Sequence, residues 1–157
     1  MSETSLLADK LKQEGEKIVE YFEGLMDEQW LIEIYTEDPV WTIRNILAHL
    51  MTSERAFVKL FESIRQGGIG VTDDFVIDRY NAGQQEKMEE LGAQELLLLF
   101  KSVREDMVAW VSGIGDSDLE KTGRHPFLGQ TTLCEMIKMV YLHNQIHYRD
   151  IKKALSQ

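Results

Sequence analysis

Residues 132–155 read TLCEMIKMVYLHNQIHYRDIKKAL, which is the pattern of one long amphipathic helix. Thr132 and Glu135 form a capping-box pattern at its start, in which each side chain satisfies the other residue's free backbone amide. We expect the helix to run to about Leu155. One face repeats at helical spacing and predicts a buried stripe of Met136, Val140, His143, His147, Ile151 and Ala154.

Two earlier segments have the same periodicity. The first helix should start after Thr4 and fade before Asp27, with a buried face of Leu7, Leu11, Ile18, Phe22 and Leu25. Thr42 can cap a second helix that runs to about Gln66 and stops at the following glycine pair. Its predicted inner face is Ile46, His49, Leu50, Ser53, Phe57, Leu60 and Ile64.

The segment between these helices and the last one is less regular. Asp73 or Asp74 can start a third helix, but Gly92 predicts a break before the strongly helical stretch 95–111. A loop is expected over 124–129. Because no part of the chain alternates with period two, we predict an all-α fold, a four-helix bundle formed by a single domain over residues 1–157, with antiparallel or crossed-over connections.

The composition excludes several classes of function. The net charge of −10 would repel a phosphate backbone, so we do not expect nucleic acid as a partner. Cys134 is the only cysteine, which rules out an intramolecular disulfide, and we interpret it as a small core residue rather than a nucleophile. The polar amino terminus lacks a secretory pattern, and the longest apolar run, 96–100, is too short for a membrane span. We therefore expect a soluble cytoplasmic protein.

Three histidines are the candidate metal ligands. His143 and His147 are four residues apart on the last helix, so their side chains lie on one face, about 5–6 Å apart at Cβ. His49, from the inner face of a facing helix, could complete the set and leave a fourth position open, as in catalytic metal sites. The spacing alone leaves an alternative, because such a pair can arise by chance and a lone inward histidine is often a hydrogen-bonded core residue.

Two stretches give the chain its resemblance to a known family. Residues 41–50, WTIRNILAHL, and residues 125–133, HPFLGQTTL, leading to HNQIH at 143–147, resemble the motifs of the DinB-like (YfiT-like) family of bacterial four-helix proteins. The order and length of the elements agree over nearly the whole chain. The chain departs from the family after His147, where YRD stands at 148–150 in place of a frequent arginine-glycine-glutamine run, and this puts the substrate contacts in doubt.

The resemblance implies a divalent metal, commonly zinc or nickel, held between helices two and four of the bundle by His49, His143 and His147. It also implies frequent homodimers. Relatives with a known activity include bacillithiol S-transferases and the mycothiol-dependent maleylpyruvate isomerase, in which the metal activates the thiol of a low-molecular-weight cosubstrate.

Other polar residues are weaker candidates. Asp150 shares a face with His147 and could orient a histidine ring or act as a base, although a solvated aspartate is the simpler interpretation. His125 lies in a loop before a proline, and we do not expect it to be a ligand. Residues that could approach the open metal position from the third helix are Asp78, Tyr80 and Asn81. A solvated face is expected for Glu86, Glu89 and Glu90.

Three functions fit these residues. The first is transfer of a low-molecular-weight thiol onto a small electrophile. The second is a metal-dependent hydrolase, in which zinc brings the pKa of water to about 7. The third is a non-catalytic metal-binding or stress-related bundle protein whose histidines satisfy one another. The first is favoured by the resemblance, by an all-nitrogen site that suits a soft thiolate, and by the lack of a firmly placed carboxylate base.

Overall fold

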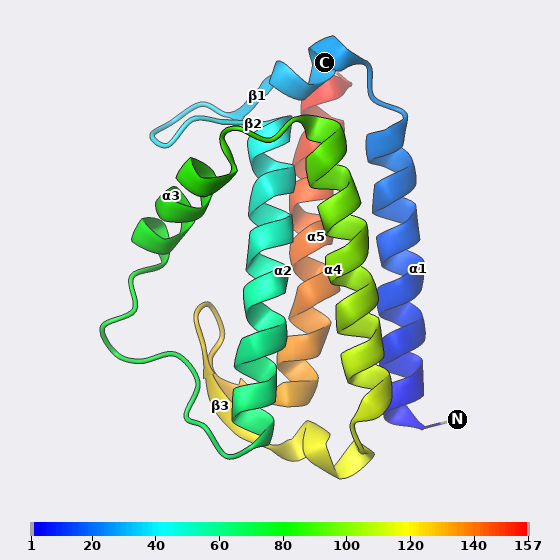
Figure 1. The fold of residues 1–157 in the computed structure, drawn as a ribbon, viewed down its shortest axis with the longest axis vertical. Coiled ribbons are helices and arrows are strands. Elements are labelled where there is room, and N and C mark those ends of the chain that lie inside the picture. Colours follow the sequence, from blue (N-terminus) through cyan, green and yellow to red (C-terminus); the bar gives the residue numbers. More distant parts are fainter. Residues whose placement is uncertain (1, 157) are drawn as a thin grey trace.

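The computed structural model describes residues 2–156, and four long helices form a bundle (Figure 1). They are α1 (Glu3–Glu23), α2 (Ile43–Arg65), α4 (Ala93–Gly113) and α5 (Leu133–Leu155). In Figure 1, α1 and α5 run upward, whereas α2 and α4 run downward. Both α1 and α2 pack against α4 and α5, so α1 and α2 occupy opposite corners of the bundle. The predicted four-helix bundle is confirmed, and its connection from α2 to α4 is the long crossover.

Hydroxyl side chains start three of the four bundle helices. Ser2, rather than Thr4, caps α1, and its hydroxyl accepts a hydrogen bond from the amide of Ser5. Thr42 caps α2 as predicted. Thr132 accepts from the Glu135 amide at 3.2 Å, so the predicted cap of α5 is present in this half. The ends of α2 and α5 agree with the sequence prediction to within one residue.

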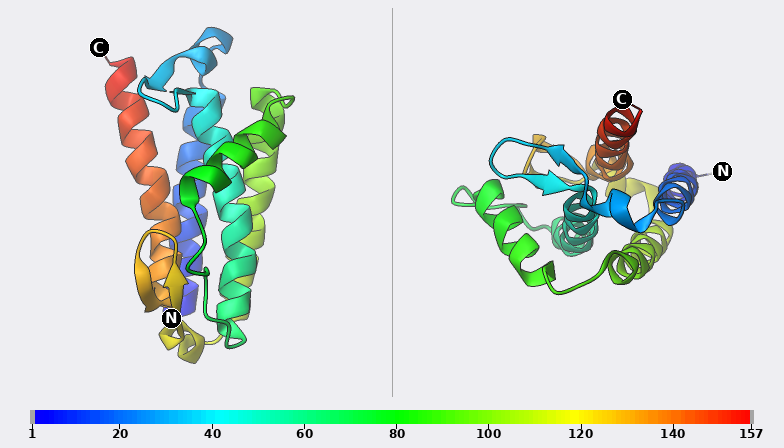
Figure 2. Two further views of the ribbon diagram at one scale, coloured as in Figure 1. Left: turned by 90° about the vertical axis from the view of Figure 1, so that its left-hand side faces the viewer. Right: turned by 90° about the horizontal axis from the view of Figure 1, so that it is seen from above.

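The crossover contains a short helix, α3 (Ile77–Met88), which lies outside the bundle against α2 (Figure 2). The predicted break before α4 is confirmed, although α3 begins a few residues later than Asp74. None of its residues is buried, and the three glutamates at 86, 89 and 90 are exposed as expected. The Arg44 guanidinium donates to the carbonyl of Leu91, which ties the end of α3 to the start of α2.

The sequence did not predict two short antiparallel hairpins, which stand where only loops were expected. They are β1 (Glu33–Tyr35) with β2 (Trp41–Thr42), and β3 (Thr122–His125) with β4 (Gly129–Thr132). One lies at each end of the bundle (Figure 1). Strands of two to four residues are too short for an alternating pattern to stand out in the sequence. Two turns of 3₁₀ helix, η1 (Asp27–Leu31) and η2 (Asp116–Glu120), precede the hairpins.

The hydrophobic core is divided by a layer of polar side chains. One apolar cluster includes Phe22, Leu50 and Phe100, and the other includes Leu11, Phe61 and Met107. Between them, on successive helices, lie Gly15, Glu54, Arg104 and Asn144.

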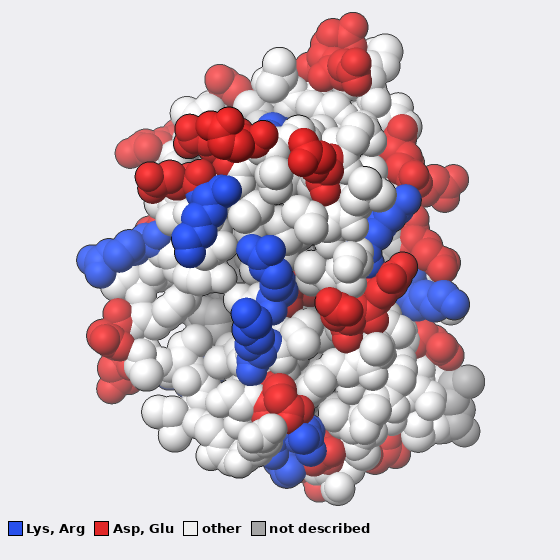
Figure 3. Space-filling model, viewed as in Figure 1, with Lys and Arg blue, Asp and Glu red and all other residues white. Residues whose placement is uncertain are grey.

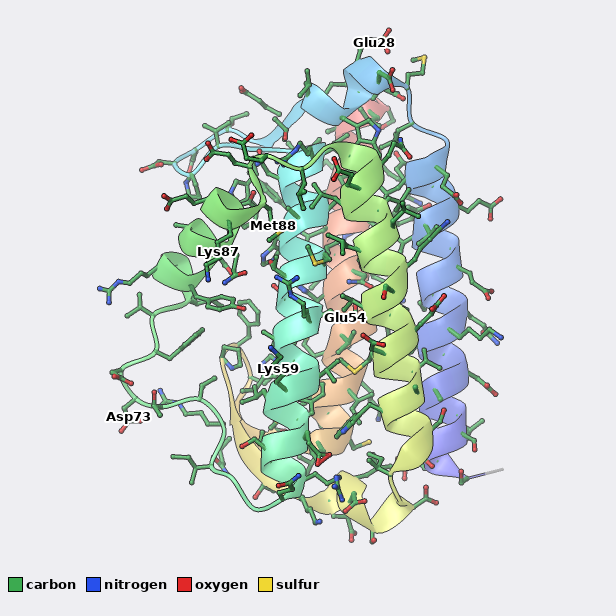
Figure 4. The ribbon with its side chains drawn as sticks, viewed as in Figure 1. Glu28, Glu54, Lys59, Asp73, Lys87 and Met88 are labelled. Atoms are coloured by element: carbon green, nitrogen blue, oxygen red, sulfur yellow. The ribbon has the colours of Figure 1, made fainter. Side chains whose placement is uncertain are left out.

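Arg104 is the centre of this layer. Its guanidinium donates to Glu54 at 2.7 and 2.8 Å, to the Leu11 carbonyl at 2.8 Å, and to the Asn144 side chain. Glu54 is halfway along the bundle in Figure 4 and is 2% exposed. A Cβ at Gly15 would stand 2.8 Å from the Arg104 side chain, which explains a glycine in the middle of α1.

The three tryptophans and the cysteine are buried to different extents. Trp30 is buried and stacks on Phe22, whereas Trp41 and Trp110 are half-buried. Cys134 is half-buried at the edge of the core, where it packs against the apolar cluster that includes Leu11 and Phe61. Its thiol donates a hydrogen bond to Glu3 at 3.4 Å. No helix within residues 2–156 has both the length and the apolar character of a membrane span.

Candidate metal centre

His49, His143 and His147 meet between α2 and α5. Nε2 of His143 lies 3.0 Å from Nε2 of His49 and 3.0 Å from Nε2 of His147. One ring nitrogen from each of the three residues lies within 4.8 Å of the others. The rings of His49 and His143 are perpendicular, at 88°. The long helices therefore bring together the three side chains singled out in the sequence.

The donor set fits a divalent ion. A ring nitrogen has either one proton or one lone pair, so Nε2 of His143 cannot form good hydrogen bonds to both neighbouring nitrogens. A shared cation would use all three lone pairs. Two nitrogens bound to one zinc ion at about 2.0–2.1 Å stand about 3.3–3.4 Å apart at the tetrahedral angle, so the rings need to separate by only a few tenths of an ångström to hold the ion. Imidazole nitrogens suit zinc, copper, iron and nickel.

Tyr35 and Asp150 hold the ring of His147. The Tyr35 hydroxyl donates to Oδ2 of Asp150 at 2.6 Å, and its oxygen lies 2.7 Å from Nδ1 of His147. Because the hydroxyl donates its only hydrogen to Asp150, its oxygen accepts a hydrogen bond from the N–H at Nδ1 of His147. This tautomer leaves the Nε2 lone pair of His147 free to face the other histidines.

Asp150 thus reaches the histidine through Tyr35, which the sequence analysis missed. Nothing in the sequence marks Tyr35, because it enters the site only through the unpredicted β1–β2 hairpin. Burial and the hydrogen bond to Asp150 raise the pKa of the Tyr35 hydroxyl well above its ordinary value. The hydroxyl therefore stays protonated and keeps its bond to the carboxylate.

The surroundings of the histidines favour their neutral forms. Burial lowers the pKa of His49 to about 3 and, together with the neighbouring histidines, lowers that of His143 to about 2. Burial lowers the pKa of His147 to about 4, although Asp150 opposes this shift. Neutral imidazoles are the form that binds metals. The Trp41 ring packs against the ring of His49, with 4.8 Å between the ring centroids. The Ser53 hydroxyl lies 3.4 Å from Nδ1 of His49.

His125 is a structural residue of the β3–β4 hairpin and lies outside the histidine cluster. Its Nδ1 accepts hydrogen bonds from the amides of Phe127 and Leu128, at 3.0 and 3.2 Å. The ring is 1% exposed and stacks on Phe57. His125 therefore fixes the hairpin turn. The turn places Phe127 against the ring of His143, with 5.8 Å between the ring centroids.

Two cavities adjoin the centre, one on each side of Asn81. The first, of about 770 Å³, is the more polar of the two and is bordered by Tyr35 and Trp41, which contact the histidines, and by Asp78. The second, of about 360 Å³, is mostly apolar and includes Ser53, Phe127 and Tyr80. The three residues of the third helix that were predicted to approach the site line these cavities. Asp78 lines the first cavity, Tyr80 lines the second, and Asn81 lines both.

Charge is unevenly spread over the surface around these cavities. Figure 3 shows Asp and Glu side chains at the upper end and along the right edge of the molecule. Lys and Arg side chains instead gather over α3 and the middle of α2, around a hollow. The net charge of −10 therefore does not describe the face that carries the hollow.

A family model matches this chain over residues 10–151, and the model is that of the DinB superfamily. The chain belongs to the DinB superfamily. The match spans the bundle and both histidine-bearing helices. No curated protein matches the sequence at a significant level.

Solved structures share the fold at low sequence identity. YfiT from Bacillus subtilis, described as "a probable metal-dependent hydrolase with an unusual four-helix bundle topology", is 18% identical with a TM-score of 0.77, over 98% of this chain and 87% of YfiT. The colibactin self-resistance protein ClbS, in complex with double-stranded DNA, is 13% identical with a TM-score of 0.76, over 98% and 95%. An uncharacterised protein from Escherichia coli UTI89 is 15% identical with a TM-score of 0.72, over 96% and 89%.

Proposed function

We propose that His49, His143 and His147 bind one divalent ion, zinc or nickel, and that the protein transfers a low-molecular-weight thiol onto a small electrophile. The observation that carries the proposal is the convergence of three Nε2 atoms, with two cavities whose walls include residues that contact these histidines. A transferase needs room for two reactants beside one centre, whereas hydrolysis of a small molecule needs room for one and a water. The bound ion would lower the pKa of the thiol so that the reaction uses the thiolate.

The residues of the chain have separate roles in this reaction. Tyr35 and Asp150 orient His147, and burial keeps the three histidines neutral. The thiol sulfur forms a bond to the electrophilic carbon, the leaving group departs with its electron pair, and the thiol proton passes to solvent. Cys134 has no part, because it lies on the first turn of α5 and its thiol pKa is raised by burial.

A metal-dependent hydrolase is the second candidate. It is supported by the similarity to YfiT, which is described as a probable hydrolase of this kind. Asp150 reaches His147 through Tyr35 on the Nδ1 edge of the ring, which is the edge away from the three Nε2 atoms. Since this carboxylate is already used to hold His147, we rank hydrolysis below thiol transfer.

Nucleic acid is a weaker proposal for this chain, although ClbS is in complex with double-stranded DNA. The sequence identity to ClbS is 13%, and the net charge of this chain is −10. A duplex would be repelled by most of the surface. We propose a small-molecule substrate instead.

The test begins with elemental analysis of protein purified without a histidine tag, which should find about one divalent ion per chain. Metal-loaded protein should consume chlorodinitrobenzene only when a thiol such as cysteine is added. His143→Ala should abolish the enzymatic rate, while Cys134→Ser should retain it. Turnover of nitrophenyl acetate without thiol would favour the hydrolase, and equal thiol consumption by His143→Ala would contradict thiol transfer at the histidine centre.

A further inference from the structure

The apolar cavity between α2, α3 and the β3–β4 hairpin has the dimensions of a small-molecule site. Its volume of about 360 Å³ corresponds to about twelve water-sized groups at about 30 Å³ each. Its walls include four aromatic rings, and the full apolar lining is Ala56, Phe57, Leu60, Val71, Phe75, Ile77, Tyr80, Pro126 and Phe127. Such a concave, mostly apolar space is typical of ligand sites. A bicyclic aromatic body or a short alkyl chain would fill it.

Two cations stand at the mouth of this cavity. Lys59 is part of its lining, and Figure 4 shows it on α2. Arg55 lies one turn earlier on α2, and its positive charge acts on the hydroxyl of Tyr80 in the cavity wall. Neither cation forms an ion pair with any of the described residues, whereas Asp73, in the loop before α3, is paired with Arg124. An anion would therefore meet two free positive charges at this mouth.

The inner end of the cavity reaches the histidine centre. Ser53 lines the cavity and is the residue beside Nδ1 of His49, and Phe127 lines it and packs against His143. A molecule with its apolar body in the cavity would thus have one end at Arg55 and Lys59 and the other close to the histidines.

We propose that this cavity binds a small anionic amphiphile, with an aromatic or short aliphatic body of about twelve heavy atoms and one carboxylate held between Arg55 and Lys59. The identification of this molecule as the electrophilic substrate rests on the proposed function. Its binding does not, because the cavity and the cations exist without the reaction.

Calorimetric titration with naphthoate and naphthamide tests the proposal at low ionic strength. The two molecules have the same body, and only naphthoate is an anion. We expect naphthoate to bind more tightly, with an affinity that falls as salt is added. Equal affinities for the two molecules would overturn the proposal, because they would mean that the cations take no part.

Matched variants locate the ligand. Replacing both Arg55→Gln and Lys59→Gln should weaken naphthoate binding about 30-fold and leave naphthamide unchanged, since two lost charge contacts in water, at about 1 kcal/mol each, sum to about 2 kcal/mol. Ala56→Trp should weaken both ligands by filling the cavity. The controls Lys12→Gln and Ala109→Trp lie in the cleft between α1 and α4 and should change neither affinity.

A failure of the proposed function remains distinguishable from a failure here. His143→Ala should lose turnover but still bind naphthoate in the cavity. If wild-type protein shows no metal and no turnover while naphthoate follows the pattern above, the cavity assignment stands and the enzyme proposal falls. Naphthoate binding that is unaffected by the Arg55, Lys59 and Ala56 variants, or weakened as much by the controls, would refute the assignment.

Discussion

Replacing Tyr35→Phe removes one hydroxyl from the path that links Asp150 to His147. The change deletes two short hydrogen bonds, of 2.6 Å to Asp150 and 2.7 Å to Nδ1 of His147, and leaves the aromatic ring in place. His147 would then lose the partner that fixes both its ring orientation and its tautomer. The proposed ion should therefore bind less tightly although all three ligands remain.

The expected loss can be estimated from the part that Tyr35 plays. Removal of the hydrogen-bond partner of a metal-bound histidine lowers metal affinity by about 10–100-fold, which is about 1.4–2.7 kcal/mol. The cost to folding should be smaller, about 0.5–1.5 kcal/mol for a hydrogen bond, because Asp150 is half-buried and can be rehydrated. Metal affinity should thus change by more than the free energy of unfolding of the metal-free protein.

Competition with a chelator of known zinc affinity measures the first quantity, and urea unfolding after metal removal measures the second. Tyr21→Phe is the matched control, because Tyr21 packs on Tyr148 and its hydroxyl forms no hydrogen bond among the described residues. Asp150→Asn should weaken metal binding in the same direction as Tyr35→Phe. Equal zinc affinities for the Tyr35 and Tyr21 variants would refute the argument that Tyr35 orients a ligand.

Four further predictions concern stability. Gly15→Ala should destabilise the protein in urea titrations, because the new Cβ would meet Arg104, which Glu54 holds in place. This clash should outweigh a gain of about 1 kcal/mol in helix propensity. A more stable variant would show that Arg104 moves aside easily. His125→Ala should cost about 1–3 kcal/mol by leaving two amides of the hairpin without an acceptor, and His125→Asn should recover part of this loss in the same assay. Chelation should lower the melting temperature at pH 7. In the folded, metal-free protein, the histidine pKa values are lowered from 6.5 to about 2–4. Because the unfolded chain then binds more protons than the folded chain below pH 6.5, the free energy of unfolding should fall as the pH drops from 6.5 towards 4. A flat profile over that range would mean that the histidines are not buried as neutral groups.

The bundle and the meeting of the histidines could be predicted because both follow from long-range periodicity. The stripe on α5 repeats over six turns, so the inward position of His143 does not depend on any one residue. The capping threonines, Thr42 and Thr132, then set the start of each histidine-bearing helix. With both helix phases fixed, only the packing of α2 against α5 was needed to bring the rings together.

The residues that complete the site could not be predicted, because they depend on contacts with no periodic signal. Tyr35 lies 112 residues from His147 in the sequence and arrives on a strand of three residues. The cations at the cavity mouth, Arg55 and Lys59, look like any exposed helical face until α3 is placed beside them. Gly15 did leave a signal, since a lone glycine inside a helical pattern often has a packing reason, but its partner Arg104 is on another helix.

The division between bundle and outer elements also bears on how the site could change its substrate. The three histidines are on α2 and α5, next to a buried ion pair whose loss would cost about 3–5 kcal/mol, so changes there are penalised by the fold. In contrast, α3 has no buried residue, yet its polar side chains Asp78, Asn81 and Gln85 line the cavity of about 770 Å³. Substitutions on α3 can therefore alter what reaches the histidines at little cost in stability.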